Sequence, residues 1–171
     1  MGSNKKRLYI ALYPSGVVNN EERRYHWGFL IGPKVEKAEK IPGTRCHVKN
    51  GPKGWVYEEV GLQNVRSTAS LLVPIVIAKI TDERRLLQIL RQTPVVQNNP
   101  NWRCRTWVAQ VLEAIKRDGK CVGTSFLDWT AIEPKAREYV ATKSAAGRYA
   151  TGNMLAPKPT FNILERRETV S

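Results

Sequence analysis

Hydrophobic positions in the first half of the chain fall in short runs with a period of two residues, which is typical of β-strands. Runs of this kind predict strands at residues 7–13, 25–32, 44–49, 55–60 and 70–80. Pro14, Ser15 and Gly16 end the first run, and Pro74 predicts an irregularity in the last and most apolar one. Residues 17–24 are polar, and the mixed charges of residues 34–40 predict a solvated hairpin or turn.

From residue 81 the spacing of hydrophobic positions changes to three and four, which predicts helices. The first opens at Thr81, places Leu86 and Leu90 on one face, and ends before Pro94. In the second, which Asn101 can cap and which ends near Gly119, one face carries Trp107, Val108, Val111, Leu112 and Ile115. A third helix is predicted from Thr130 to about Gly147, because Thr130 and Glu133 have the spacing of a capping box.

Strands followed by helices predict an α+β fold in which an antiparallel sheet packs against helices. The length of the chain suits one domain, predicted here at residues 1–152. Residues 153–171 contain the Pro-rich segment APKP and are predicted to form an extended or disordered C-terminal tail.

The chain is strongly basic, with 28 Lys and Arg against 15 Asp and Glu and a net charge of +13. Such an excess favours attraction to polyanions. The three cysteines form no CxxC pair, which suits a reducing compartment and predicts a cytoplasmic protein. No apolar run has the ~18–20 residues of a membrane span, and no signal peptide is recognisable.

Cys104 opens the second helix, among backbone N–H groups without intrahelical partners and between Arg103 and Arg105. Such surroundings lower a cysteine pKa from its usual value of about 8.5, which predicts a reactive thiolate. A thiol nucleophile also needs a base and a group that orients the base. The two histidines of the chain, His26 and His47, both fall on predicted strands. We therefore assign Cys104 as the nucleophile, His26 as the base and His47 as the orienting residue.

The segments His26-Trp27-Gly28-Phe29, Arg45-Cys46-His47 and Trp102-Arg103-Cys104 resemble the circularly permuted papain-like superfamily. This superfamily includes NlpC-type peptidases and lecithin:retinol acyltransferase-like enzymes. In it a histidine begins one strand, a polar residue follows on the next strand, and the cysteine opens a later helix. The resemblance implies a permuted papain-like arrangement and the same three roles for Cys104, His26 and His47.

The basic side chains and the thiol together predict a substrate that carries an acyl group on RNA, that is, an aminoacyl-tRNA. Arginines predicted to contact the RNA are Arg23, Arg24, Arg84, Arg85, Arg103 and Arg105. The enzyme would transfer the aminoacyl group to an amine and form a dipeptide or cyclodipeptide. More loosely, the chain resembles the fungal arginine-containing cyclodipeptide synthases, which implies a carboxylate for the arginyl group. Predicted substrate-binding residues are Trp27, Trp55, Trp102, Glu58, Glu59 and Asp128.

Two alternatives remain open from the sequence. The first is a thiol hydrolase or acyltransferase for peptide, ubiquitin-like or lipid substrates, in which the charge binds an anionic membrane surface. The second is a non-catalytic basic RNA-binding module in which Cys104 is merely packed. No metal or cofactor is predicted, because the cysteines and histidines lack zinc-site spacings and no Gly-rich phosphate loop occurs.

Overall fold

The computed structural model describes residues 6–34, 42–65, 70–150 and 157–171. Residues 35–40 of the predicted hairpin lie outside these ranges. The strands are β1 (Arg7–Pro14), β2 (Tyr25–Gly32), β3 (Gly43–Gly51), β4 (Gly54–Leu62), β5 (Val73–Ile80), β6 (Val122–Ser125), β7 (Thr160–Asn162) and β8 (Arg167–Val170). The helices are α1 (Glu83–Gln92), α2 (Cys104–Asp118) and α3 (Trp129–Ala145), and a 3-10 turn occupies Glu21–Arg23.

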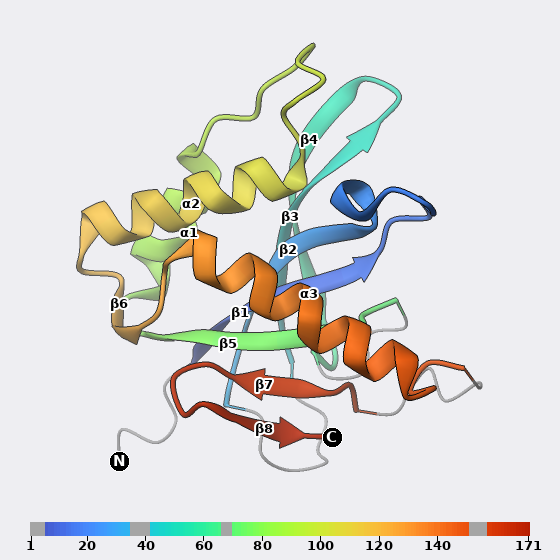
Figure 1. Ribbon diagram of the computed structural model, residues 1–171. Coiled ribbons are helices and arrows are strands. Elements are labelled where there is room, and N and C mark those ends of the chain that lie inside the picture. Colours follow the sequence, from blue (N-terminus) through green and yellow to red (C-terminus); the bar gives the residue numbers. More distant parts are fainter. Residues whose placement is uncertain (1–5, 35–41, 66–69, 151–156) are drawn as a thin grey trace.

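The strands form one eight-stranded sheet in the order β4-β3-β2-β1-β5-β7-β8, with β6 paired to β5. Neighbouring strands are antiparallel except β5 and β7, which are parallel, so the sheet is mixed. Helices α1, α2 and α3 lie on one face of this sheet (Figure 1). The predicted α+β class is confirmed, with a mostly antiparallel sheet.

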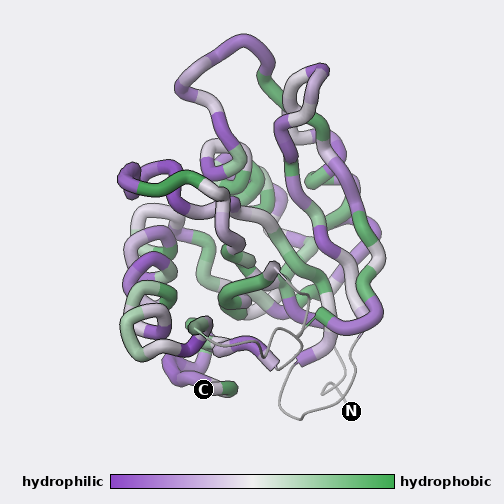
Figure 2. Tube along the Cα trace, turned by 90° about the vertical axis from the view of Figure 1, so that its right-hand side faces the viewer, coloured by the Kyte–Doolittle hydropathy of each residue, from purple (hydrophilic) through white to green (hydrophobic). Residues whose placement is uncertain are grey.

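The main hydrophobic core lies between the sheet and the helices, where Figure 2 shows most of the hydrophobic residues. Alternate residues of β1 and β2, such as Leu8 and Phe29, face the predicted inner residues of α2, among them Trp107. The other face of the strands carries a smaller cluster that includes Tyr9, Tyr13 and Leu30. Because side chains alternate across a strand, each face of β2 has its own set of neighbours.

The C-terminal segment forms strands, where the sequence predicted an extended or disordered tail. Residues 160–162 and 167–170 are strands β7 and β8, and the N–H of Ile163 donates to the carbonyl of Val76 in β5. These strands extend the sheet beyond β5, so this part of the chain belongs to the domain. Strand β6 was also not predicted from the sequence; it has four residues, three of them exposed.

The N-caps differ from the prediction at all three helices. Asp82, not Thr81, is the N-cap of α1 and accepts from the N–H of Arg85. Arg103, not Asn101, is the N-cap of α2, and its N–H donates to Oγ1 of Thr106 at 3.2 Å. Asp128, not Thr130, caps α3 and accepts from the N–H of Thr130. Each difference shifts a helix start by no more than a few residues, and Cys104 is the first residue of α2.

Candidate functional site

Cys104 lies where the start of α2 meets the start of β2. Its side chain is nearly buried, with 7% exposed, and its sulfur accepts a hydrogen bond from the N–H of Trp27 at 3.5 Å. The ladder between β2 and β3 reaches only from Ile31 to Phe29, so the N–H of Trp27 is not used within that ladder. The thiol therefore occupies a position that a neighbouring strand would otherwise fill.

His26, His47 and Glu58 form a hydrogen-bonded chain across β2, β3 and β4. Nε2 of His26 lies 2.7 Å from Nδ1 of His47, and Nε2 of His47 lies 2.7 Å from Oε1 of Glu58. The register of β3 and β4 pairs His47 with Glu58, which places both side chains on the same face of the sheet. Lys49 adds an ion pair to Oε2 of Glu58 at 3.1 Å.

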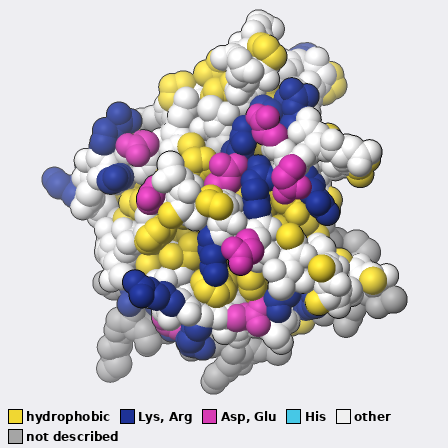
Figure 3. Space-filling model, viewed as in Figure 1, with side chains coloured by type: hydrophobic (Ala, Val, Ile, Leu, Met, Phe, Trp, Pro, Cys, Tyr) yellow, Lys and Arg dark blue, Asp and Glu magenta, His cyan; other side chains and the backbone are white. Residues whose placement is uncertain are grey.

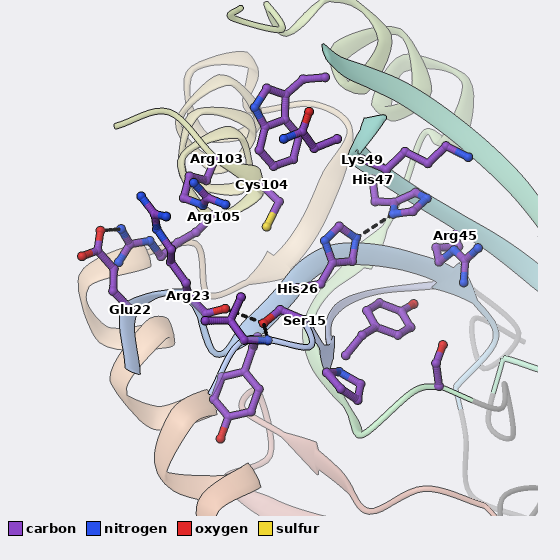
Figure 4. A pocket seen from close by; sticks show the side chains of 17 residues that line it. Ser15, Glu22, Arg23, His26, Arg45, His47, Lys49, Arg103, Cys104 and Arg105 are labelled. Carbon is purple, nitrogen blue, oxygen red and sulfur yellow. Dashed lines mark hydrogen bonds and ion pairs between the residues drawn. The ribbon is translucent and has the colours of Figure 1, made fainter. Parts of the chain in front are cut away.

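The carboxylate of Glu58 determines the direction of this chain, because an ionised carboxylate only accepts hydrogen bonds. Nε2–H of His47 then donates to Glu58, and Nδ1 of His47 accepts from Nε2–H of His26. The remaining nitrogen of His26, Nδ1, is left without a proton. Figure 4 shows His26 between His47 and Cys104, with the sulfur on the side of the ring turned away from His47. The proton-accepting nitrogen of His26 and the Cys104 thiol thus lie at the same cavity.

Burial governs the protonation of the two reacting groups. It lowers the pKa of His26 to about 4, and the nearby charges of His47 and Arg45 act in the same direction. Burial also raises the pKa of the Cys104 thiol, although the N–H groups of Trp27 and Arg105 and the charge of Arg103 oppose it. The predicted lowering of the Cys104 pKa is therefore wrong for the free protein. The resting pair is a neutral thiol beside a neutral imidazole.

The hydrogen bond between His47 and Glu58 acts on the pKa values of both groups. Burial lowers the pKa of His47, although the hydrogen bond that His47 donates to Glu58 opposes this effect. The pKa of Glu58 is lowered mainly by its hydrogen bond with His47. Glu58 is therefore a carboxylate at neutral pH, as the direction of the chain requires.

A cavity of about 430 Å³ opens beside Cys104. It is lined by Tyr13, Pro14, Ser15, Val17, Glu22, Arg23, Tyr25, His26, Arg45, His47, Lys49, Asn50, Trp55, Ser70, Arg103, Cys104 and Arg105. Figure 4 shows that labelled basic side chains lie on both sides of the thiol and the two histidines. Among the described residues, the cavity thus combines a thiol, a base and a mainly cationic wall.

Only one of the three tryptophans predicted to bind substrate lines the cavity, as the described residues show it. Trp55 lines the cavity, whereas Trp27 is fully buried in the core and Trp102 is only 3% exposed. Trp27 cannot contact a substrate there, which corrects its predicted role, and Trp102 supports Trp55 through a ring contact at 5.6 Å. Their size and apolar rings make the core the favourable place for both.

None of the predicted acids lines the cavity among the described residues. Glu58 belongs to the histidine chain. Glu59 forms two hydrogen bonds with Arg91, and Asp128 caps α3. Their predicted role as carboxylates for an arginyl group therefore receives no support from their positions.

The predicted RNA-binding arginines fall into two groups. Arg23, Arg103 and Arg105 line the cavity, although Arg105 also pairs with Glu22 and Glu133. The others lie elsewhere: Arg24 pairs with Glu21, Arg85 pairs with Asp118, and Arg84 is exposed on α1. On the helix-bearing face, Lys and Arg alternate with Asp and Glu (Figure 3). The basic side chains therefore do not form a continuous positive surface on that face.

Sequence reasoning missed Tyr13 and Arg45 and gave Glu58 another role. The two-residue period did place Arg45 on the same face of its strand as His47. Nothing in the period shows which strands are neighbours, and only the register brings Glu58 to His47 and Tyr13 to His26.

No group of three or more His, Cys, Asp and Glu side chains that could hold a metal ion occurs within the described parts of the chain. Among the helices that the structure describes, none is long and apolar enough to cross a membrane.

The fold and the site define an α+β protein in which a helix-opening cysteine and the two histidines of a His-His-Glu chain line one cavity beside a mostly antiparallel sheet. The chain belongs to DUF6914, a family of unknown function, whose model matches residues 5–170. Comparison with the curated proteins finds no match. Comparison with the solved structures finds none either.

Proposed function

We propose that this protein is a cysteine-dependent acyl transferase in which Cys104 is the nucleophile. The observation that carries the proposal is the chain from Glu58 through His47 to His26, which leaves a proton-accepting nitrogen of His26 in the cavity that Cys104 also lines. Along the chain, the strand with His26 comes first, the strand with His47 second and the helix with Cys104 last. This order also supports the resemblance to permuted papain-like enzymes. A packed structural cysteine needs none of these groups.

The first step transfers the acyl group from its donor to the enzyme. His26 Nδ1 takes the proton of the Cys104 thiol while the sulfur attacks the carbonyl carbon of an ester donor. The bond between that carbon and the alcohol oxygen then breaks, and the alcohol leaves with the proton from His26. A thioester remains on Cys104, and His26 is again neutral.

Two features of the structure assist this step. The imidazolium formed on His26 is stabilised through His47 by the negative charge of Glu58. The N–H of Cys104 lies in the first turn of α2, where backbone N–H groups lack intrahelical acceptors, and can donate to the developing oxyanion. Together they stabilise opposite charges on the two sides of the reacting bond.

The donor we propose is an aminoacyl-tRNA, which carries its acyl group as an ester on the 3′ ribose. Arg23 and Arg103 line the cavity and form no ion pair with any residue that the structure describes. Unpaired arginines at the cavity suit phosphates. The net charge of +13 favours the approach of RNA. The looser resemblance to the fungal cyclodipeptide synthases supports the same class of donor.

Intact-protein mass spectrometry after brief incubation with mixed aminoacyl-tRNA tests the proposal. Wild type should gain the mass of one aminoacyl group, and Cys104→Ala should gain none. Arg117→Gln, on the exposed end of α2, is the control for nonspecific charge effects and should behave as wild type. An adduct that persists in Cys104→Ala would refute the nucleophile. No adduct in wild type would refute the tRNA donor and favour a hydrolase or transferase with another acyl donor.

A further inference from the structure

The cavity has a second wall on the side of His26 away from Cys104. Tyr13 of β1 pairs in register with His26, and their rings lie 5.7 Å apart. Arg45 of β3 precedes His47 by two residues and therefore lies on the same face of that strand. Its guanidinium carbon is 5.7 Å from the centre of the Tyr13 ring. Tyr13 and Arg45 thus meet beside the base.

Both side chains carry hydrogen-bond donors that the protein leaves unused. Tyr13 is only 4% exposed, and its buried hydroxyl donates to no acceptor among the described residues, while the neighbouring Arg45 guanidinium can only donate to it. The buried Nε of Arg45 has no hydrogen-bond partner within those parts of the chain either. Buried donors are nearly always paired, because an unpaired donor destabilises a fold. Two such donors at a cavity wall indicate a missing acceptor.

The acceptor that fits this pair is an anion. Burial raises the pKa of Tyr13 to about 12, so the hydroxyl keeps its proton and remains a donor. Arg45 is a permanent cation whose planar guanidinium suits a carboxylate. The RNA backbone is a poor candidate for this position, because successive phosphates need an open surface and Tyr13 is almost entirely covered.

We propose that Tyr13 and Arg45 form a carboxylate subsite that binds the acyl acceptor, a free α-amino acid. This inference rests on the proposed function, because it places the amine of the acceptor toward the thioester on Cys104.

The second half of the reaction then follows. The amine nitrogen of the bound amino acid attacks the thioester carbonyl carbon, and His26 takes a proton from that nitrogen. The carbon–sulfur bond breaks, and the sulfur regains a proton from His26 as the free thiol. The product is an amide that keeps the carboxylate of the acceptor, which is a linear dipeptide when the donor is aminoacyl-tRNA.

Ligand-observed NMR on Cys104→Ala tests the subsite without catalysis. The proteinogenic L-amino acids are added one at a time, and each that binds is compared with its carboxamide. We expect at least one amino acid to bind and its carboxamide to bind about tenfold more weakly or worse, since a hydrogen bond to a charged group is lost. Arg45→Gln and Tyr13→Phe should weaken binding of the acid, while Arg117→Gln should not.

Tyr13→Phe keeps the inference testable if Arg45→Gln fails to fold. It removes only the hydroxyl that lacks an acceptor, so it should raise the melting temperature of the free protein while it weakens binding of the amino acid. A purely structural tyrosine would lower the melting temperature. Equal binding of acid and amide, unchanged binding in Tyr13→Phe, or no binding of any amino acid would each overturn the subsite.

The two proposals can fail separately. Amino-acid binding by Cys104→Ala together with no adduct from aminoacyl-tRNA would leave the subsite standing and remove the donor. An adduct on wild type together with no amino-acid binding would leave the nucleophile and the donor and overturn the acceptor.

Discussion

Gly28 offers a test of whether the close approach of β2 and β3 organises the site. A Cβ atom at Gly28 would lie 2.9 Å from Cβ of His47 and 3.3 Å from the carbonyl oxygen of Cys46. Carbon atoms pack best at about 3.5–4.0 Å, so Gly28→Ala must move β3 by roughly 0.6 Å or more. Neither neighbouring atom is the end of a flexible side chain, and the backbone itself has to shift.

The same displacement acts on the histidine chain. The bond between His26 and His47 is 2.7 Å long, and a shift of that size lengthens it to about 3.3 Å, outside the usual range for a hydrogen bond. Overpacking of this kind costs about 1–3 kcal/mol, which corresponds to a fall in Tm of roughly 2–12 °C for a chain of this length. Gly28→Ala should therefore lose both stability and reactivity of Cys104.

Heat denaturation and the rate at which iodoacetamide modifies Cys104 measure the two effects. Gly61→Ala in β4 is the matched control, because a Cβ there meets no atom within 4 Å and the variant should keep both properties. If Gly28→Ala melts and reacts as Gly61→Ala does, the close approach at His47 has no importance for the site.

Three further predictions concern the reacting groups. Glu58→Gln keeps the shape of the side chain but removes its charge, and should slow iodoacetamide modification of Cys104 about tenfold, as loss of a charged hydrogen bond implies. Burial lowers the pKa of His26 from 6.5 to about 4, so between these pH values the unfolded chain binds a proton that the folded protein does not. The free energy of unfolding should therefore be highest above pH 6.5 and fall by roughly 3 kcal/mol as the pH falls to 4. His26→Gln should flatten that slope in denaturant titrations. Iodoacetamide should modify one thiol of the native protein, because Cys46 and Cys121 are fully buried and burial raises their pKa to about 12 and about 11.

Each of these predictions has a contrary result. An unchanged modification rate in Glu58→Gln would show that the charge of Glu58 does not affect the reactivity of Cys104. An acid slope that persists in His26→Gln would assign the titration to another group. Modification of Cys104→Ala in its native state would show that the reactive thiol is Cys46 or Cys121.

Local patterns in the sequence determined the elements that carry the nucleophile and the base. The strand predicted at residues 25–32 and the helix that opens at Cys104 have the predicted bounds in the structure. These elements are long, strongly periodic and ended by turn residues or glycine, so neighbouring residues alone specify them. The same periods correctly placed Trp107 in the core and Arg45 and His47 on one strand face.

Tertiary structure decided which side chains meet. Glu58 reaches His47 only because β4 pairs with β3 in one register, and a strand pattern carries no information about its partner. The C-terminal strands β7 and β8 are too short for a recognisable period, and they form because β7 pairs with β5 and β8 with β7. The pKa of Cys104 likewise depends on burial, which outweighs the helix start and the flanking arginines that the sequence displays. Periodicity fixes the face of each residue, but packing fixes its neighbours and its distance from water, and these two properties determine the chemistry of the site.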